Sequence, residues 1–538
     1  MPGPPGKVGE QSFVSPTLKA SKFPRTIPKW LTGTLLRNGP GKFEVGDEPY
    51  KHWFDGLALI HRFSFHDGQV TYQNRFLRSD AYNKAMKYNR IILSEFGTLG
   101  IPDPCKTIFE RFATHLVPLN ITDNDLINVF TIGDEIYVNT ETCFFRRISN
   151  TETLEFDKKR INQFRTLGVL TASAHPHVDR DGTTYNMASS YMTGSCYNIV
   201  KYGKESSDDP SKNAEIIGTI RAKHCLKPSY YHSFGMTENY FIFLEQPLYI
   251  NLKKLATAQL RGSAICTCLE FDNNAKSYFH LMEKKTGKKL SIEYEADGFF
   301  GMHVINAYED EGHVVFDMCC YHDDELITKF YLDYLRNGDH EGKRHFSPSS
   351  SMRFVMPLHV NLSTTPRGRN LVTLKNCKAV AVLQKNGTVH ITPEKISEAI
   401  TDMPRINYDK CNQRPYTYYY GVAACKPGDF TNGLVKVNVR QKSFELWSDD
   451  DCYPSEPVFI ESPGAVMEDD GVIVSTVINT RKRSAFLLVL DASTFTELGR
   501  ANIPDEVECP VGFHAMYLSK QQTQLANQSH KQNGLPSV

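Results

Sequence analysis

The sequence of 538 residues contains no long hydrophobic run and no excess of charge of either sign. No stretch approaches the roughly 20 consecutive apolar residues of a membrane-spanning helix, so we expect a chain that does not cross a bilayer. Lysine plus arginine and aspartate plus glutamate each total 61. This balance provides no overall field that would attract a polyanion, and it predicts that nucleic acid is not a partner.

Cysteine is present, but the pattern of a disulfide framework is not. The 13 cysteines are an odd number at irregular spacings, and Cys319 and Cys320 are adjacent. Cys266 and Cys268 lack the second close pair that a zinc site needs. The first residues do not have the features of a secretory signal peptide. We therefore expect reduced thiols in a protein that is cytoplasmic or mitochondrial and is not secreted.

Helical periodicity is also scarce, and short segments rich in β-branched and aromatic residues recur instead. The clearest predicted strands lie within residues 126–139, 239–245, 313–319, 379–391, 434–446, 472–477 and 485–490. Turn signals such as Asn386-Gly387 separate them, and no βαβ alternation occurs. The fold class is therefore predicted to be all-β, and a β-propeller fits a chain of this length best. No internal repeat is sharp enough to give the number of blades.

Composition divides the chain into three parts. Residues 1–25 are rich in proline, glycine, serine and lysine, which predicts a flexible N-terminal arm. Residues 26–518 are predicted to form a single propeller domain. Residues 519–538 are rich in glutamine, asparagine and serine, which predicts a disordered polar tail.

Two segments, residues 105–116 and 252–261, interrupt the strand pattern. In the first, Ile108, Phe109 and Phe112 share one helical face. Both segments suit an interfacial helix that places apolar side chains in a membrane surface, although periodicity alone favours a helix packed on its own domain. Cys105 lies beside the first helix and is a candidate for acylation if that helix contacts a membrane.

Four histidines lie at the mouths of predicted strands. They are His175 in AHPHV, His232 in SYYHSF, His303 in FGMHVI and His514 in VGFHAM. Their wide separation excludes a zinc finger and suits a radial fold in which each of several blades sends one ligand to a common axis. The chain has 18 histidines, so spacing alone leaves this assignment open.

A site of four neutral imidazoles with open positions favours iron(II) or copper over calcium or magnesium. We expect nearby carboxylates to accept the outer ring N–H groups and to fix each tautomer. Glu141 and Glu456, each close to the end of a predicted strand, are the candidates.

Several long segments are distinctive: LLRNGPG, HWFDGLALIHRF, SEFGTLGIPDPCK, AHPHVDRDGTTYN, KPSYYHSFGMTENYFIFLEQP and DDCYPSEPVFI. They resemble the animal carotenoid cleavage oxygenases, and the resemblance extends from about residue 30 to 517. Within this family, HSFGMT and IPDPCKTIFERF look closest to the β-carotene 9′,10′-oxygenases. The resemblance implies a seven-bladed β-propeller with iron(II) on its axis and a cap of helices and loops that forms an apolar tunnel.

The resemblance also implies roles for individual residues. His175, His232, His303 and His514 match the four iron ligands of the family, and Glu141 and Glu456 match two of the three outer glutamates. The third glutamate maps to Asp402, a shorter acid, and Met302 stands where an aromatic residue is commoner. We expect a retuned rather than an inactive site, because an aspartate can still bond an imidazole N–H.

The implied reaction joins O2, as co-substrate, to one double bond of a carotenoid or xanthophyll and gives an apocarotenal and an ionone-type product. Phe96, Phe299 and Phe300 are candidates for the tunnel wall or, alternatively, for blade core. Other readings remain: central 15,15′ cleavage to retinal, a retinoid isomerohydrolase that uses the same iron site, and an inactive carotenoid-binding propeller. A peripheral membrane contact is expected for so insoluble a substrate, and the sequence leaves a homodimer open.

Overall fold

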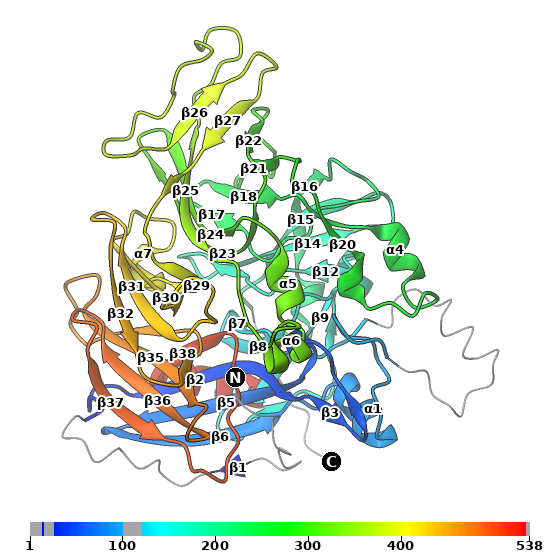
Figure 1. Ribbon diagram of the computed structural model, residues 1–538, viewed down its shortest axis with the longest axis vertical. Coiled ribbons are helices and arrows are strands. Elements are labelled where there is room, and N and C mark those ends of the chain that lie inside the picture. The colour runs from blue at the N-terminus through cyan, green and yellow to red at the C-terminus, as the bar shows by residue number, and fades with distance from the viewer. Residues whose placement is uncertain (1–12, 15–25, 101–120, 206, 534–538) are drawn as a thin grey trace.

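A ring of seven mainly antiparallel sheets makes up the propeller within the part of the chain that the structure, a computed structural model, describes: residues 13–14, 26–100, 121–205 and 207–533 (Figure 1). The chain passes from blade to blade in sequence order, so that the orange strands near the C-terminus lie beside the blue N-terminal strands (Figure 1). The prediction of an all-β propeller, with the seven blades that the family resemblance implied, is therefore confirmed.

Each blade is described from its first strand outward. The first blade contains β38 (Ala515–Ser519), β2 (Gly33–Lys42), β5 (Leu57–His66), β6 (Gln69–Phe76) and β1 (Phe13–Val14). The second contains β7 (Asn128–Ile132), β8 (Glu135–Asn139), β9 (Phe144–Asn150), β10 (Glu155–Phe156) and β11 (Ile161–Asn162). The third contains β12 (Thr171–Ala172), β13 (His177–Val178), β14 (Thr184–Ser190), β15 (Cys196–Tyr202) and β16 (Glu215–Arg221).

The fourth blade contains β17 (Gly235–Met236), β18 (Tyr240–Glu245), β21 (Ser277–Glu283), β22 (Tyr294–Ala296), β27 (Val389–Thr392) and β26 (Val380–Leu383). The fifth contains β23 (Phe300–Asp310), β24 (His313–Tyr321), β25 (Ser350–Pro357) and β28 (Glu394–Lys395). The sixth contains β29 (Ile400–Arg405), β30 (Tyr418–Ala424), β31 (Gly433–Asn438) and β32 (Ser443–Ser448). The seventh contains β33 (Cys452–Pro454), β34 (Val458–Glu461), β35 (Gly471–Asn479), β36 (Ser484–Asp491) and β37 (Glu497–Asn502).

The first strands of the blades line the central axis. Strand β17 contacts β23, β23 contacts β29, β34 contacts β38, and β38 contacts β7. The ring closes in the first blade, where β38 from the end of the chain pairs with β2 from its beginning, from Gly33↔Ser519 to Arg37↔Ala515. This pairing ties the two ends of the propeller together and removes an open sheet edge at the closure.

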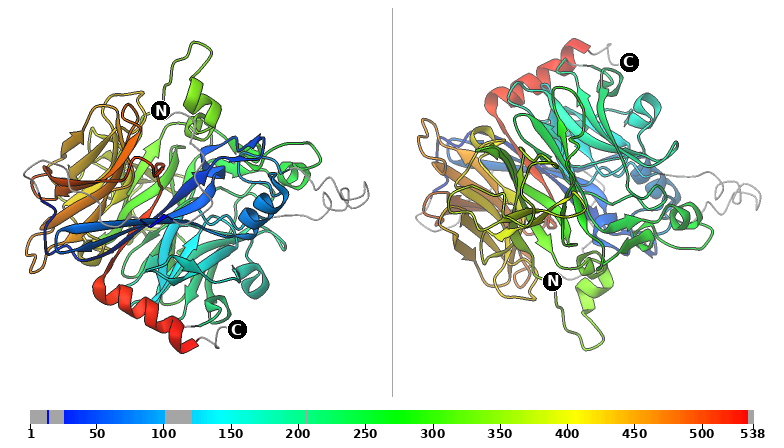
Figure 2. Two further views of the ribbon diagram at one scale, coloured as in Figure 1. Left: turned by 90° about the horizontal axis from the view of Figure 1, so that it is seen from below. Right: turned by 90° about the horizontal axis from the view of Figure 1, so that it is seen from above.

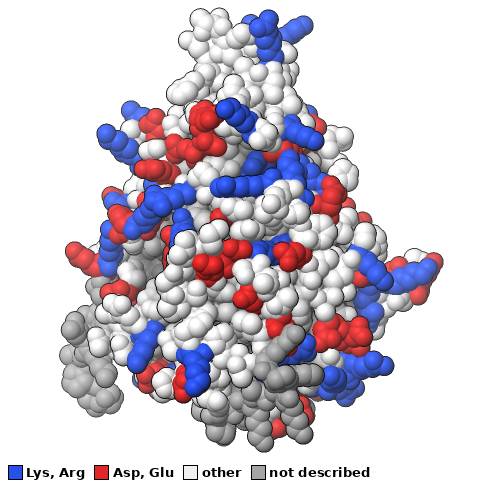
Figure 3. Space-filling model, turned by 90° about the vertical axis from the view of Figure 1, so that its left-hand side faces the viewer, with Lys and Arg blue, Asp and Glu red and all other residues white. Residues whose placement is uncertain are grey.

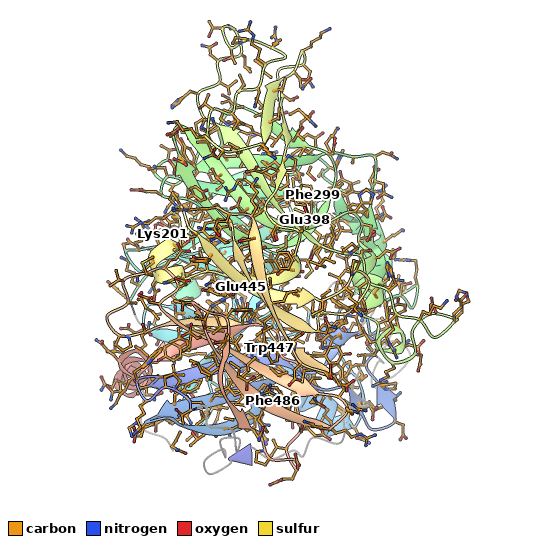
Figure 4. All side chains as sticks on the ribbon, turned by 60° about the vertical axis from the view of Figure 1, so that its left-hand side comes forward. Lys201, Phe299, Glu398, Glu445, Trp447 and Phe486 are labelled. Atoms are coloured by element: carbon orange, nitrogen blue, oxygen red, sulfur yellow. The ribbon has the colours of Figure 1, made fainter. Side chains whose placement is uncertain are left out.

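Apolar side chains fill the space between neighbouring blades. In β24 every residue is buried, as expected for a strand covered on both faces. The core between the sixth and seventh blades includes Trp447 of β32 and Phe486 of β36 (Figure 4). These inter-blade cores hold the first strands in fixed positions around the axis.

Short helices and two small ladders lie outside the blades. The helices are α1 (Asp80–Tyr88), α3 (Gln163–Leu167), α4 (Leu252–Thr257), α5 (Glu325–Lys329), α6 (Leu332–Asn337), α7 (Tyr408–Cys411) and α8 (Lys520–Asn533), with 3-10 turns η1 (Trp53–Asp55), η2 (Pro210–Lys212) and η3 (Ile265–Cys268). The ladders are β3 (Glu44–Val45) with β4 (Glu48–Pro49) and β19 (Leu248–Ile250) with β20 (Leu269–Phe271).

The C-terminal tail differs from its prediction. Residues 519–538 were expected to be disordered, but Lys520–Asn533 form α8, which lies along the outside of the first and second blades (Figure 2). Ala526 is buried there, and the Asn527 side chain accepts hydrogen bonds from the backbone and side chain of Thr151. Tertiary contacts therefore order a segment whose polar composition resembles a disordered one. In the N-terminal arm, β1 pairs with β6.

Acidic and basic side chains are interspersed on the face shown in Figure 3. Among the described residues, no helix is both long and apolar enough to span a membrane.

Candidate metal centre

The four histidines singled out in the sequence all lie within or beside the first strands of their blades. His175 occupies the break between β12 and β13, and His303 lies within β23. His514 directly precedes β38, and His232 lies three residues before the start of β17. Because first strands line the axis, blades that are distant in sequence bring these side chains to one point. Their ligand nitrogens all lie within 4.8 Å of one another.

The Nε2 atoms make the closest approaches. Nε2 of His232 lies 2.8 Å from Nε2 of His175 and 3.2 Å from Nε2 of His303. The rings of His175 and His514 pack edge to face, with centroids 4.4 Å apart. Nitrogen atoms facing one another at these distances are a donor set for a cation rather than a set of mutual hydrogen bonds, because a neutral imidazole has only one N–H.

Three of the histidines have a carboxylate on the other ring nitrogen. Nδ1 of His232 lies 2.6 Å from Oε1 of Glu141. Nδ1 of His303 lies 2.8 Å from Oδ1 of Asp402, and Nδ1 of His514 lies 2.8 Å from Oε1 of Glu456. Each contact places the ring proton on Nδ1 and leaves the Nε2 lone pair facing the centre. For His175, no carboxylate partner is found among the described residues.

The three carboxylates are themselves held in place. The Tyr230 hydroxyl donates to Oε2 of Glu141 at 2.9 Å, and the Tyr321 hydroxyl donates to Oδ2 of Asp402 at 2.5 Å. Oε2 of Glu456 accepts from the backbone N–H of Ala515 at 2.8 Å. Each carboxylate thus has one oxygen on a histidine and the other on a fixed donor, so its orientation is determined.

Charge at the centre is divided between neutral rings and ionised acids. Burial lowers the pKa of His514 to about 4, although Glu456 acts in the opposite direction. Burial, together with the neighbouring histidines, lowers the pKa of His175 well below its ordinary value. Burial alone would raise the pKa of Glu456, but Arg405 and His514 lower it to about 2. At neutral pH the rings of His175 and His514 are therefore unprotonated and available as ligands.

Asp402 reaches His303 through a local irregularity of β29. The pairing of β29 with β30 shifts register between Asp402 and Arg405, and Met403 adopts a left-handed φ of 50°. The Met403 N–H donates to Oδ1 of Asp402 at 2.8 Å. A β-bulge of this kind redirects a side chain, which explains how the shorter acid contacts the ring directly.

The structure adds Arg37, a residue of β2 that sequence reasoning did not assign to the site. This buried guanidinium donates to the backbone oxygens of Phe513 at 3.0 Å and Glu456 at 2.7 Å. It thereby joins the residue before His514 to the acid that holds His514. The signal in the sequence was an arginine within LLRNGPG, a segment that begins with apolar residues. An arginine in a strand that becomes buried needs fixed partners.

A cavity of about 560 Å³ reaches the histidine cluster. His232, His303 and His514 lie on its wall, and most of the remaining wall is apolar. The aromatic part of the wall consists of Trp53, Phe54, Phe96, Tyr191, Tyr230, Tyr321, Phe330, Phe346, Phe430 and Phe513. A cavity with this lining accepts an elongated apolar molecule and excludes water from the centre.

Of the three predicted tunnel residues, the structure places one on the cavity wall and two in the apolar core. Phe96 lies on the cavity wall, as does Met302. Phe299 and Phe300 do not: Phe299 stacks on Phe354 in the core of the blades, with ring centroids 5.1 Å apart (Figure 4), and Phe300 is fully buried beside Tyr321. Phe299 belongs to the apolar core that includes Phe354, and Phe300 belongs to the core that includes Tyr321.

The two predicted interfacial segments have different outcomes. Cys105, Ile108, Phe109 and Phe112 lie outside the described residues. The second segment includes α4, whose Leu252 and Leu255 line the cavity. Its apolar face therefore contributes to the cavity wall.

Comparisons with known proteins cover almost the whole chain. Residues 18–519 match the family model described as retinal pigment epithelial membrane protein. A carotenoid-cleaving dioxygenase, mitochondrial, from Mustela putorius furo is 42% identical, with 94% of each chain covered. A β,β-carotene 15,15′-dioxygenase from Rattus norvegicus is 41% identical, with 92% of this chain and 88% of the relative covered.

A solved structure shares the fold. Cobalt-substituted apocarotenoid oxygenase from Synechocystis superposes with a TM-score of 0.74 at 21% identity, covering 95% of this chain and 97% of that one. The family match and the relatives together show that the chain belongs to the family of the retinal pigment epithelial membrane protein and the carotenoid cleavage oxygenases.

Proposed function

We propose that the chain is a non-heme iron(II) dioxygenase that cleaves one double bond of a carotenoid polyene. The observation that carries this proposal is the opening of the histidine cluster onto a large, mainly apolar cavity. The relatives named as carotenoid-cleaving and 15,15′ dioxygenases support it.

The residues fit iron(II). His175, His232, His303 and His514 would hold it, because four neutral nitrogen donors suit a first-row transition metal and leave coordination positions free. When bound, iron(II) supplies the one-electron chemistry that lets triplet O2 react with a closed-shell alkene. Glu141, Asp402 and Glu456 hold the ring protons on Nδ1 and compensate the charge of the cation.

The chain's own contribution is placement of the substrate. The reaction adds both atoms of O2 across one C=C bond and gives two carbonyl groups, so atoms and electrons balance without a reductant. Trp53, Phe54 and Phe513 lie on the cavity wall and offer ring faces and edges to a flat polyene. Register along this wall then decides which double bond lies nearest the histidines.

The proposed bond is the eccentric 9′,10′ double bond. The segments HSFGMT and IPDPCKTIFERF support this register. A relative named for 15,15′ cleavage is nearly as similar as one named for carotenoid cleavage in general, so central cleavage is the second candidate. Product analysis separates the two, because only central cleavage of a symmetric carotenoid gives two equal halves.

The test uses the full chain loaded with iron(II) under anaerobic conditions. O2 and β-carotene in detergent are then added, and products are resolved by chromatography and mass spectrometry. Two unequal carbonyl fragments support the proposal, and two equal fragments move the cleaved bond to the centre. Intact β-carotene, despite one iron bound per chain, would overturn the oxygenase proposal.

We also propose that the rim of the cavity contacts a membrane surface from which the substrate enters. Met192 and Ile265 line the cavity yet are 74% and 38% exposed, and Leu260 nearby in sequence is 55% exposed. Lys253 and Arg261 provide cations beside them. In a flotation assay with anionic vesicles, the double variant M192S/L260S is expected to float less than the wild type, and equal flotation would contradict this contact. Imaging of the full chain in cells would show whether the protein is cytoplasmic or mitochondrial.

A further inference from the structure

We propose that Glu95 is a specificity-determining residue that binds an oxygen atom at one end of the substrate, so that the cavity prefers a polyene whose ring carries a hydroxyl or keto group. This inference rests on the proposed function and concerns the wall of the same cavity. It assigns the substrate class to carotenoids with an oxygen-bearing ring rather than to pure hydrocarbons.

Glu95 is a buried acid in an apolar wall. It is 2% exposed and lies on the cavity surface next to Phe96 and Thr122. Its backbone N–H donates to the Thr98 carbonyl at 2.9 Å, which fixes the direction of the side chain. The residue therefore presents a polar group at a defined place along a mainly apolar surface.

The carboxyl group has only part of its hydrogen-bonding capacity used. The Thr122 hydroxyl donates to Oε1 at 2.7 Å. For Oε2, no hydrogen bond to any described residue is found. Buried polar atoms in native proteins almost always have a partner, and a ligand oxygen inside the cavity would supply one.

The surroundings of Glu95 favour its neutral form. Burial raises the pKa of Glu95 well above its ordinary value, and Asp55, Asp123 and Asp125 raise it further, while the bond from Thr122 opposes them. Because Thr122 donates to Oε1, the proton of the neutral acid belongs on Oε2. Glu95 is then a hydrogen-bond donor that is suited to a hydroxyl or keto oxygen.

The same cavity wall explains why such a contact is selective. An aromatic lining holds a hydrocarbon and its hydroxylated derivative almost equally well. A polar group fixed in that lining is left without a partner when a pure hydrocarbon binds, and this costs affinity. The preference is therefore determined by Glu95 and not by cavity size.

Glu95 also has a structural alternative, in which its bond to Thr122 merely joins two loops of the cap. That alternative predicts equal losses for all substrates when Glu95 is replaced. Substrate discrimination, measured as a ratio, separates the two roles because a loss of fold or of iron cancels from it.

The experiment compares β-carotene with its dihydroxylated derivative, in which each ring carries one hydroxyl. Variants are Glu95→Met, which is similar in size and cannot donate, and Glu95→Gln, which keeps a donor. The control is Glu155→Met, which replaces an exposed acid of β10 outside the cavity. Binding is followed in the metal-free chain by quenching of tryptophan fluorescence, because Trp53 lies on the cavity wall, and turnover is followed as kcat/KM.

The wild type is expected to favour the dihydroxylated polyene. In Glu95→Met the ratio of the two affinities, and of the two kcat/KM values, is expected to fall about 10- to 100-fold, while Glu95→Gln and Glu155→Met keep it. A ratio that stays within about twofold of wild type in Glu95→Met would overturn the inference. Should that variant fail to fold, Thr122→Val removes the bond that orients the acid, and an unchanged ratio there is equally adverse.

Failure of the proposed function gives a different result. If the wild type binds both polyenes with the expected preference but cleaves neither, the role of Glu95 stands and the oxygenase proposal fails. If it cleaves both with equal kcat/KM and binds both equally, the oxygenase stands and Glu95 does not select.

Discussion

Two glutamates of the cavity region are equally buried and behave in opposite ways. Glu456, at the histidine cluster, and Glu95, in the wall, are each 2% exposed. Partners hold the pKa of Glu456 at about 2, whereas burial and neighbouring acids raise the pKa of Glu95 well above its ordinary value. Burial raises the pKa of both carboxyl groups, so the neighbouring groups decide which form each one adopts. Arg405 and His514 lower the pKa of Glu456. Asp55, Asp123 and Asp125 raise that of Glu95 further.

This contrast divides the cavity into two chemical regions. At the axis, ionised acids hold neutral imidazoles for a cation. In the wall, a neutral acid can donate one hydrogen bond to an apolar ligand. The same cavity thus has charged acids beside the proposed metal site and an uncharged acid in the wall that can contact the substrate.

The largest expected effect comes from removing the partner of Glu456 at the metal. In His514→Ala, bound iron falls below one per chain and activity falls by about three orders of magnitude or more, because one of four donors is lost. Metal content by mass spectrometry and product formation are measured together. His340→Ala, on a ring that is 90% exposed, is the control, and full activity of His514→Ala would break the account.

Neutralising Glu456 tests how its charge affects iron binding without removing a histidine ligand. In Glu456→Gln the iron affinity is expected to fall about 10- to 100-fold, because the acid no longer holds the Nδ1 proton of His514 or compensates the cation. Competition with a chelator measures the affinity. An affinity equal to that of the wild type would show that the contact at 2.8 Å has no effect on the metal.

The same substitution at the two glutamates is expected to change stability in opposite directions. Glu456 has a folded pKa below its unfolded value of 4.5, so it stabilises the chain above about pH 4.5 and loses this as pH falls towards about 2. Glu95 has a raised folded pKa, so its penalty appears as pH rises above about 4.5.

At about pH 7, Glu456→Gln is therefore expected to destabilise the metal-free chain by roughly 3 kcal/mol, whereas Glu95→Gln stabilises it and loses this gain towards about pH 5. Thermal unfolding of both variants beside the wild type gives the sign. Destabilisation of similar size in both would remove the distinction between the two environments.

The smallest effect is expected at Asp402, where the sequence resemblance predicts a glutamate in the family. Its contact depends on the bulge at Met403 and on Tyr321, so Asp402→Glu overfills the site and Tyr321→Phe releases one oxygen. Each is expected to weaken iron binding by about two- to tenfold. Tighter binding in Asp402→Glu would show that the bulge does not compensate for the shorter side chain.

Much of the fold could be predicted because its signals are local. The predicted strand region 126–139 with its Gly133 turn becomes β7 and β8, and residues 434–446 become β31 and β32. The number of blades could be predicted from the family resemblance but not from periodicity, because insertions such as β26 and β27 in the fourth blade remove any regular period. The α8 helix was missed because its order comes from contacts such as Asn527 with Thr151.

The four histidines of the candidate site were predictable, and so were the acids Glu141, Asp402 and Glu456 that contact them. The irregular backbone and the residues that hold these acids were not. His175 and Glu456 occupy breaks in first strands, and His303 and Asp402 lie at register shifts. Such irregularities direct side chains towards the axis. They do not change the alternation of apolar and polar residues in a recognisable way, so the sequence pattern does not predict them. Tyr321, Arg37 and Glu95 act through residues distant in the chain, and only the folded ring brings them together.

The most direct test of the account measures iron binding and product formation on one preparation of the full chain. The account predicts one iron(II) per chain, removed by His514→Ala but not by His340→Ala, and conversion of a carotenoid by O2 to two carbonyl fragments without added reductant. One tightly bound iron with no cleavage of β-carotene or its dihydroxylated derivative would contradict the central claim.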